Sequence, residues 1–151
     1  MKKILSLVLS LILICCLVFA LAGCEREETY YWEFEKDYTH VTEIKIVVSP
    51  NGENFELNTC KVIKEIDVSY AAELMDDVEE ISMRNHLGSL IVPSGLCILF
   101  MFDNGEYDVI SRIGSSHCTY DEDGIIQERS TWLSADSDDF YNVITYYLAL
   151  D

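Results

Sequence analysis

Histidine and cysteine are the residues of this chain best suited to acid-base or nucleophilic chemistry, and they are neighbours only at His117 and Cys118. Adjacent residues on a strand point to opposite faces, so we do not expect these two side chains to form a dyad. His40 and His86 would need the fold to bring them close. Because the chain also has no zinc spacing such as Cys-x-x-Cys, we predict no catalytic residue, no metal site and no cofactor.

One acidic turn partly matches a calcium loop. Asp121–Gly124 places Asp, Asp and Gly at the third, fifth and sixth positions of an EF-hand. The first position would be Thr119 and the twelfth Ser130, so the first carboxylate and the bidentate glutamate are missing. We therefore predict a hairpin turn here, and we interpret the acidic residues of 136–139 as the cap of a helix, where the helix dipole stabilises carboxylates.

The N-terminus has the features of an export signal. Lys2 and Lys3 precede an uncharged apolar run, Ile4–Ala20, which is followed by Leu21-Ala22-Gly23-Cys24. This arrangement resembles the lipobox of bacterial lipoproteins over the first 24 residues only. The resemblance implies thioether lipidation of Cys24, cleavage before it and acylation of its new amino group. An uncleaved membrane helix is the alternative, since the run approaches the ~20 residues that span a bilayer.

Either interpretation places the rest of the chain at the outer face of a cell membrane, because lysines favour the inner side. Cleavage leaves 128 residues, which suits one domain. We expect a signal peptide over residues 1–23, an acidic aromatic tether over 24–40 and a single domain over 41–151.

The mature chain is strongly acidic. Cleavage removes two lysines and no acidic residue, so the net charge goes from −17 to −19. This charge disfavours nucleic acid, whose phosphates need Lys and Arg to replace their counterions. It favours a basic envelope protein or peptide as partner, although a solvated surface that keeps an exported protein soluble is the simpler explanation.

Three cysteines remain in the domain, Cys60, Cys97 and Cys118. An oxidising exterior permits one disulfide with three alternative pairings, and the sequence does not choose among them. Cys97 lies between Leu96 and Ile98 and is also consistent with a small buried hydrophobic residue.

Aromatic residues are concentrated just after the proposed anchor, in Tyr30-Tyr31-Trp32-Glu33-Phe34. Tyr30, Tyr31, Trp32 and Phe34 are the candidate interaction residues. They can dock on a partner or on the domain itself, and docking on the domain is the favoured interpretation.

Alternating apolar residues and turn signals predict a series of strands with local hairpins. Three hairpins are expected: Val41–Val48 with Phe55–Ile66, Leu96–Phe102 with Tyr107–Ile113, and Ser116–Tyr120 with Ile125–Trp132. A short strand without a local partner is expected at Leu90–Val92.

The central hairpin carries the strongest turn signal, because Asn104-Gly105 favours a two-residue type I′ turn. That turn predicts the pairs Phe102 with Tyr107, Phe100 with Val109, Ile98 with Ser111 and Leu96 with Ile113 on one face. Asp108 and Ile110 would then lie on the opposite face, with Leu99 and Cys97.

Two segments have helical periodicity. Ser69 is a candidate cap for an apolar stripe of Ala71, Leu74, Met75, Val78 and Ile81, and Ser134, Asp136 and Ser137 are candidate caps for a stripe of Phe140, Val143, Ile144, Tyr147 and Leu148. We predict an α+β fold, with an antiparallel sheet of about six to seven strands and two helices packed on one face.

These features favour a membrane-tethered, non-catalytic binding or interaction module. One alternative is a small exported enzyme, either a hydrolase or a thiol-dependent activity around His117 and Cys118. The other is an envelope assembly or immunity-type factor that blocks another protein.

Overall fold

The computed structural model describes residues 29–50, 55–86, 91–120, 126–130 and 133–150. The signal segment, Cys24 and the acidic turn at 121–124 lie outside these residues. The strands are β1 Val41–Ser49, β2 Lys61–Ile66, β3 Met83–Asn85, β4 Gly95–Phe102, β5 Tyr107–Ser111, β6 Ser116–Tyr120, β7 Ile126–Ser130 and β8 Leu133–Ala135, and the α-helices are α2 Ala71–Glu79 and α3 Ser137–Ala149. The predicted α+β class is confirmed.

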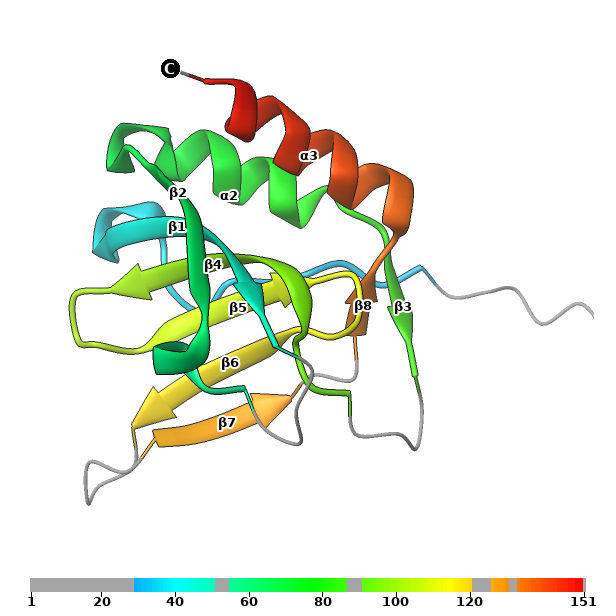
Figure 1. The fold of residues 1–151 in the computed structure, drawn as a ribbon, viewed down its shortest axis with the longest axis horizontal. Helices are drawn as coiled ribbons and strands as arrows, with labels where there is room; N and C mark the ends of the chain where they lie inside the picture. Colours follow the sequence, from blue (N-terminus) through cyan, green and yellow to red (C-terminus); the bar gives the residue numbers. More distant parts are fainter. Residues whose placement is uncertain (1–28, 51–54, 87–90, 121–125, 131–132, 151) are drawn as a thin grey trace, which may run out of the picture.

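The main sheet has the strand order β2-β1-β4-β5-β6-β7, and every neighbouring pair in it is antiparallel. The short strands β3 and β8 form a separate antiparallel pair. Helices α2 and α3 lie side by side over the sheet, and β3 with β8 lies at one end of it (Figure 1). Neither described helix is long and apolar enough to cross a membrane.

The larger core cluster lies between the helices and the sheet. The predicted stripe of α2 is buried, and Phe140, Ile144 and Tyr147 of α3 pack into the same cluster. Leu148 was predicted to belong to the α3 stripe but is exposed. Tyr147 Oη also donates a hydrogen bond to Asp77 Oδ2 at 2.8 Å, which links the two helices. A second cluster on the other face of the sheet includes Cys97, Leu99, Val109 and Cys118.

The helix caps follow the prediction at one helix only. Asp136 accepts a hydrogen bond from Asp138 N at the start of α3, as predicted. Ser69 does not cap α2, because a short 3-10 helix, Val68–Tyr70, precedes it. Asp67 caps that turn instead, by accepting a hydrogen bond from Ser69 N at 2.8 Å.

The predicted turn between β4 and β5 is wrong by one residue. Gly105 N donates to Phe102 O, and Phe102 N donates to Glu106 O, each at 2.9 Å. The loop is therefore the three residues 103–105, with Gly105 at φ +83°, as in a type I turn followed by a left-handed residue. The extra loop residue shifts the pairing of β5 with β4 by one residue from the pairing predicted for a two-residue turn at Asn104-Gly105.

This displacement exchanges the two faces of β5. The observed pairs are Leu99 with Val109, Ile98 with Ile110 and Phe100 with Asp108. Side chains alternate along a strand, so a one-residue shift moves each of them to the opposite face. Asp108 and Ile110 therefore lie on the face that packs against the helices.

Two of the predicted strands also differ. The partner of β1 begins at Lys61, because a short 3-10 helix, Leu57–Thr59, precedes it. Ile91 and Val92 belong to no strand. The strand in this region is β3, which was not among the predicted strands and forms through pairing with the distant β8.

Gly105→Ala should lower the free energy of unfolding by about 1–2 kcal/mol, because a Cβ is disfavoured in the left-handed region. Gly105→Asn should cost less, since Asn tolerates this conformation better. Urea denaturation of the three proteins measures both effects. Equal stability of the alanine variant and the parent would contradict the three-residue loop.

Candidate functional site

The candidate interaction residues are placed in three different environments. Trp32 is 1% exposed, and Phe34 and Tyr30 pack partly buried against the larger core cluster. Tyr31 is 53% exposed. Tyr30 also forms an antiparallel bridge with Met83 of β3, through N–H to O distances of 3.3 and 2.8 Å. The segment thus docks on the domain and leaves Tyr31 available to a partner.

Trp32 and Phe34 lie over a row of side chains that crosses the sheet. In this row Ile44 of β1 pairs with Phe100 of β4, Phe100 pairs with Asp108 of β5, and Asp108 pairs with His117 of β6. Phe34 meets Phe100 edge to face, with ring centroids 4.9 Å apart. Trp32 stacks on the ring of His117 at 4.3 Å. The N-terminal segment therefore covers the polar end of this row.

The polar end of the row is a buried acid-base pair. His117 Nδ1 lies 2.8 Å from Asp108 Oδ1, and the two residues are 7% and 4% exposed. Each comes from the middle of a strand, and the register of β5 with β6 places them opposite each other. Strand pairing, rather than a local motif, thus builds this contact.

Burial raises the pKa of the Asp108 carboxyl above its ordinary value, because desolvation penalises the charged form. The hydrogen bond and charge of His117 oppose that shift. The indole N–H of Trp32 also lowers the pKa of Asp108, because its dipole favours the charged carboxylate. It does not form a hydrogen bond in the described structure, where Trp32 Nε1 and Asp108 Oδ2 each have no partner. Buried polar atoms of this kind are costly unless they are satisfied.

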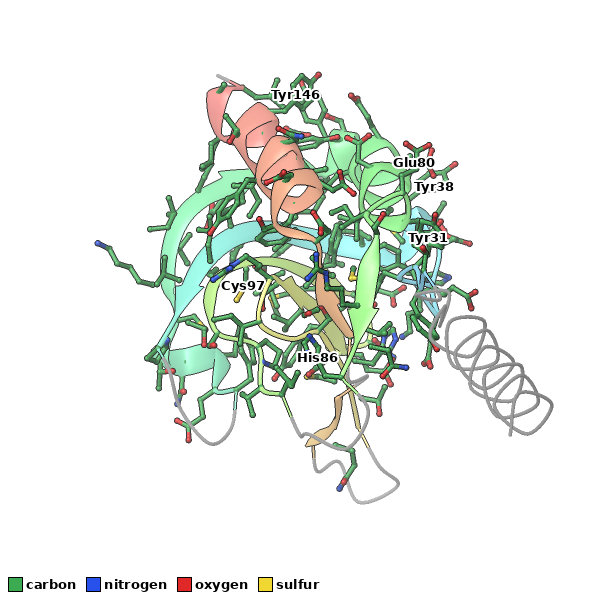
Figure 2. All side chains as sticks on the ribbon, turned by 90° about the vertical axis from the view of Figure 1, so that its right-hand side faces the viewer. Tyr31, Tyr38, Glu80, His86, Cys97 and Tyr146 are labelled. Carbon is green, nitrogen blue, oxygen red and sulfur yellow. The ribbon has the colours of Figure 1, made fainter. Side chains whose placement is uncertain are left out.

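A groove of about 460 Å³ separates the N-terminal segment from α2, and we call it the acidic groove. Its acidic residues are Glu35 and Asp37 from the segment and Asp76 and Glu79 from the helix, around an apolar floor of Phe34, Ala72 and Met75. Tyr38, which is 54% exposed, lies at its edge. Tyr38, Tyr31 and Glu80 lie on the same side of the molecule (Figure 2).

Lys36 is the one basic residue among the described residues that line the acidic groove, and Glu106 and Phe102 already contact its ammonium group. Its Nζ lies 2.6 Å from a carboxylate oxygen of Glu106 and 5.6 Å from the ring centre of Phe102. The charge of Lys36 is therefore compensated outside the groove. Lys36 therefore does not neutralise Asp37, Asp76 or Glu79, the groove carboxylates for which no ion pair with a described residue is found.

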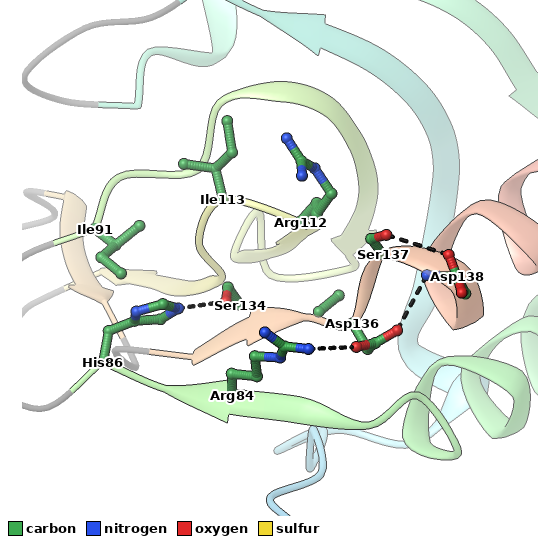
Figure 3. Close-up of a pocket in the computed structure, with 10 residues that line it drawn as sticks. Arg84, His86, Ile91, Arg112, Ile113, Ser134, Asp136, Ser137 and Asp138 are labelled. Carbon is green, nitrogen blue, oxygen red and sulfur yellow. Dashed lines mark hydrogen bonds and ion pairs between the residues drawn. The ribbon is translucent and has the colours of Figure 1, made fainter.

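A second pocket, of about 610 Å³, lies between β8 and the loop that follows β5, and we call it the arginine pocket. Its polar lining consists of Arg84, His86, Arg112, Ser134 and residues 136–138. His86 Nε2 lies 2.7 Å from Ser134 Oγ, and Arg84 Nη2 lies 3.2 Å from Asp136 Oδ2 (Figure 3).

The cysteines are positioned as structural residues. Cys60, Cys97 and Cys118 are all free thiols. Burial raises the pKa of Cys97 to about 12, which keeps it protonated and unreactive. Cys118 points away from His117 into the second core cluster, as strand alternation predicts. In the part of the chain that the structure describes, no group of three or more His, Cys, Asp or Glu residues could hold a metal ion.

No family model matches the chain, and no curated protein or solved structure is detectably similar to it.

Sequence reasoning missed the Asp108–His117 pair and both pockets. The type I′ prediction put Asp108 on the wrong face, and its nine-residue separation from His117 is no local motif. One signal was present: Asp108 is a charged residue among the apolar residues Tyr107, Val109 and Ile110 of its strand, and a buried carboxylate needs a partner.

Trp32→Ala should lower the free energy of unfolding by about 3–5 kcal/mol, as for other buried Trp residues. Tyr31→Ala, the neighbouring exposed position, should change it by less than about 0.5 kcal/mol. Chemical denaturation measures both. A small effect of Trp32→Ala would mean that the segment is not docked on the domain.

Asp108→Asn tests the buried carboxyl through pH. Because the pKa of Asp108 is raised in the folded state, the folded protein holds this proton more tightly than the unfolded chain. The stability of the parent relative to Asp108→Asn should therefore be greatest below the ordinary aspartate pKa and should fall as the pH rises through the raised value. Denaturation at several pH values measures the difference, and a difference that grows with pH would contradict this environment.

Proposed function

We propose that this protein is an extracytoplasmic lipoprotein, anchored to the cell membrane through Cys24, that binds a basic protein or peptide of the cell envelope without catalysing a reaction. In this proposal residues 1–23 are a signal peptide, and both helices pack on one face of a six-stranded sheet in a single domain. The domain presents its binding site close to the membrane.

The acidic groove is the observation that carries the proposal. It combines four carboxylates with an apolar floor, and the one lysine among its described residues is already paired with Glu106. A basic peptide with apolar side chains complements both properties, because its charges meet the carboxylates while its apolar groups contact Met75 and Phe34. The exposed rings of Tyr31 and Tyr38 add the kind of aromatic surface that interfaces favour.

The docking of the N-terminal segment supports a site near the membrane. Tyr30 is held on Met83, only six residues after Cys24. Six residues span at most about 20 Å even when fully extended. An anchored domain would thus keep the groove within reach of other envelope components.

The anchor is tested by expressing the full chain and a Cys24→Ser variant in a bacterial host. Mass spectrometry should find a diacylglycerol-modified Cys24 at the mature N-terminus, and the serine variant should lack it. An unmodified Cys24 on a released protein would refute the anchor. It would not bear on peptide binding by the acidic groove, which is measured independently.

The groove is tested with the purified lipoprotein and a fluorescent Lys/Leu peptide, compared with a Glu/Leu peptide of the same pattern. The Lys/Leu peptide should bind, and added salt should weaken its binding through screening. Combining Asp76→Asn with Glu79→Gln should weaken binding about tenfold, as expected for the loss of two charge pairs.

The matched control combines Glu56→Gln with Glu65→Gln, which removes two exposed carboxylates outside the groove. The control should change affinity less than about twofold, because distant charges are screened. Equal losses in both variants would show a general charge effect and would refute a groove-specific site.

A further inference from the structure

The arginine pocket is a second cavity, and it is lined by different helices, strands and loops from those of the acidic groove. Its volume of about 610 Å³ lies inside the range of about 300–1,000 Å³ that is usual for small-molecule sites. Its lining combines the polar groups of Figure 3 with the apolar side chains of Ile91 and Ile113. This pocket can therefore hold a small ligand that has both a polar and an apolar part.

The loop that carries Arg112 is held in place by an internal network. Ser111 Oγ donates to Gly114 O at 2.6 Å and accepts from Ile113 N and Gly114 N at 3.2 and 3.1 Å. A Cβ on Gly114 would lie 2.8 Å from the carbonyl oxygen of Ile91, so the loop packs closely on that segment. The backbone that presents Arg112 and Ile113 is thus organised before any ligand arrives.

The charges around the pocket are unequally satisfied. The carboxylate of Asp136 pairs with Arg84 and accepts Asp138 N at 3.1 Å, so it is doubly engaged. Asp138 accepts a hydrogen bond from Ser137 Oγ at 3.3 Å. Arg112 is exposed and makes no hydrogen bond or ion pair with any residue that the structure describes. Among the described lining residues, its guanidinium is therefore the arginine group that a ligand can reach without displacing an ion pair.

We propose that the arginine pocket binds a small ligand in which one carboxylate is attached to an apolar body. Arg112 holds the carboxylate, because a planar guanidinium matches a carboxylate with two parallel hydrogen bonds. Ile91 and Ile113 contact the apolar body. The nearby carboxylates of Asp136 and Asp138 disfavour a doubly charged phosphate and leave a singly charged group as the better match.

This ligand chemistry can come from a free acid or from the C-terminal residue of a peptide. Calorimetric titration of the full-length protein distinguishes them with N-acetyl-isoleucine and the peptide Ala-Ala-Ile, each compared with its carboxamide and with inorganic phosphate. At least one carboxylate probe should bind more tightly than its amide and than phosphate. The tighter of the two carboxylates identifies the source.

Arg112→Gln should weaken binding of that carboxylate about tenfold or more, as expected for the loss of a charge-assisted hydrogen-bonded pair. Lys61→Gln removes one exposed positive charge outside the pocket and should change affinity less than about twofold. Arg112→Lys should give an intermediate loss, because it keeps the charge and loses the planar pair of donors.

The proposal is overturned if neither carboxylate binds saturably, if the amides or phosphate bind as tightly, or if Arg112→Gln binds like the parent. Urea denaturation of the Arg112 variants, which alter an exposed side chain, verifies that they are folded. The acidic groove contains none of these residues, so failure here would leave the proposed basic partner unaffected.

Discussion

The register of β4 against β5 is the constraint on which the rest of this structure depends. A three-residue turn ending at Gly105 brings Phe100 opposite Asp108 and Ile98 opposite Ile110. Because alternate residues of a strand face opposite sides, that turn decides the environment of every β5 side chain. It places Ile110 in the core beneath the helices and buries a carboxylate beside it.

That buried carboxylate accounts for the position of the N-terminal segment. Asp108 needs a partner away from water, and β6 supplies His117 directly opposite it. Trp32 then stacks on His117 and excludes solvent from the pair. Since the same segment forms one wall of the acidic groove, the polar row and the groove are parts of a single arrangement.

Charge is distributed unevenly over the described part of this acidic protein. Carboxylates gather between α2 and the N-terminal segment, whereas two of its arginines line the pocket beside β8. The pocket beside β8 is also lined by Asp136 and Asp138, so its arginines are balanced in number, whereas one lysine faces four carboxylates among the described residues of the acidic groove. The groove and the pocket share no residue, so the two proposed ligands would not compete for the same side chains.

The sequence by itself determined the elements whose signals are local. Helical periodicity identified the buried stripe of α2 and, apart from the exposed Leu148, that of α3, and Asp136 was recognised as a cap, because these patterns depend on residues a few positions apart. Pairing of β1 with β2, β4 with β5 and β6 with β7 also followed from short connections. The α+β class could be predicted on that basis.

Only the tertiary structure decided the features that depend on distant partners. Strand β3 exists because β8 pairs with it, and Trp32 is buried because His117 and the sheet lie beneath it. The acidic groove and the arginine pocket are each lined by segments that are far apart in the chain. The hairpin register was also undecided, because Asn104-Gly105 fits both a two-residue and a three-residue loop, and packing of Ile110 and Asp108 against the core distinguishes them.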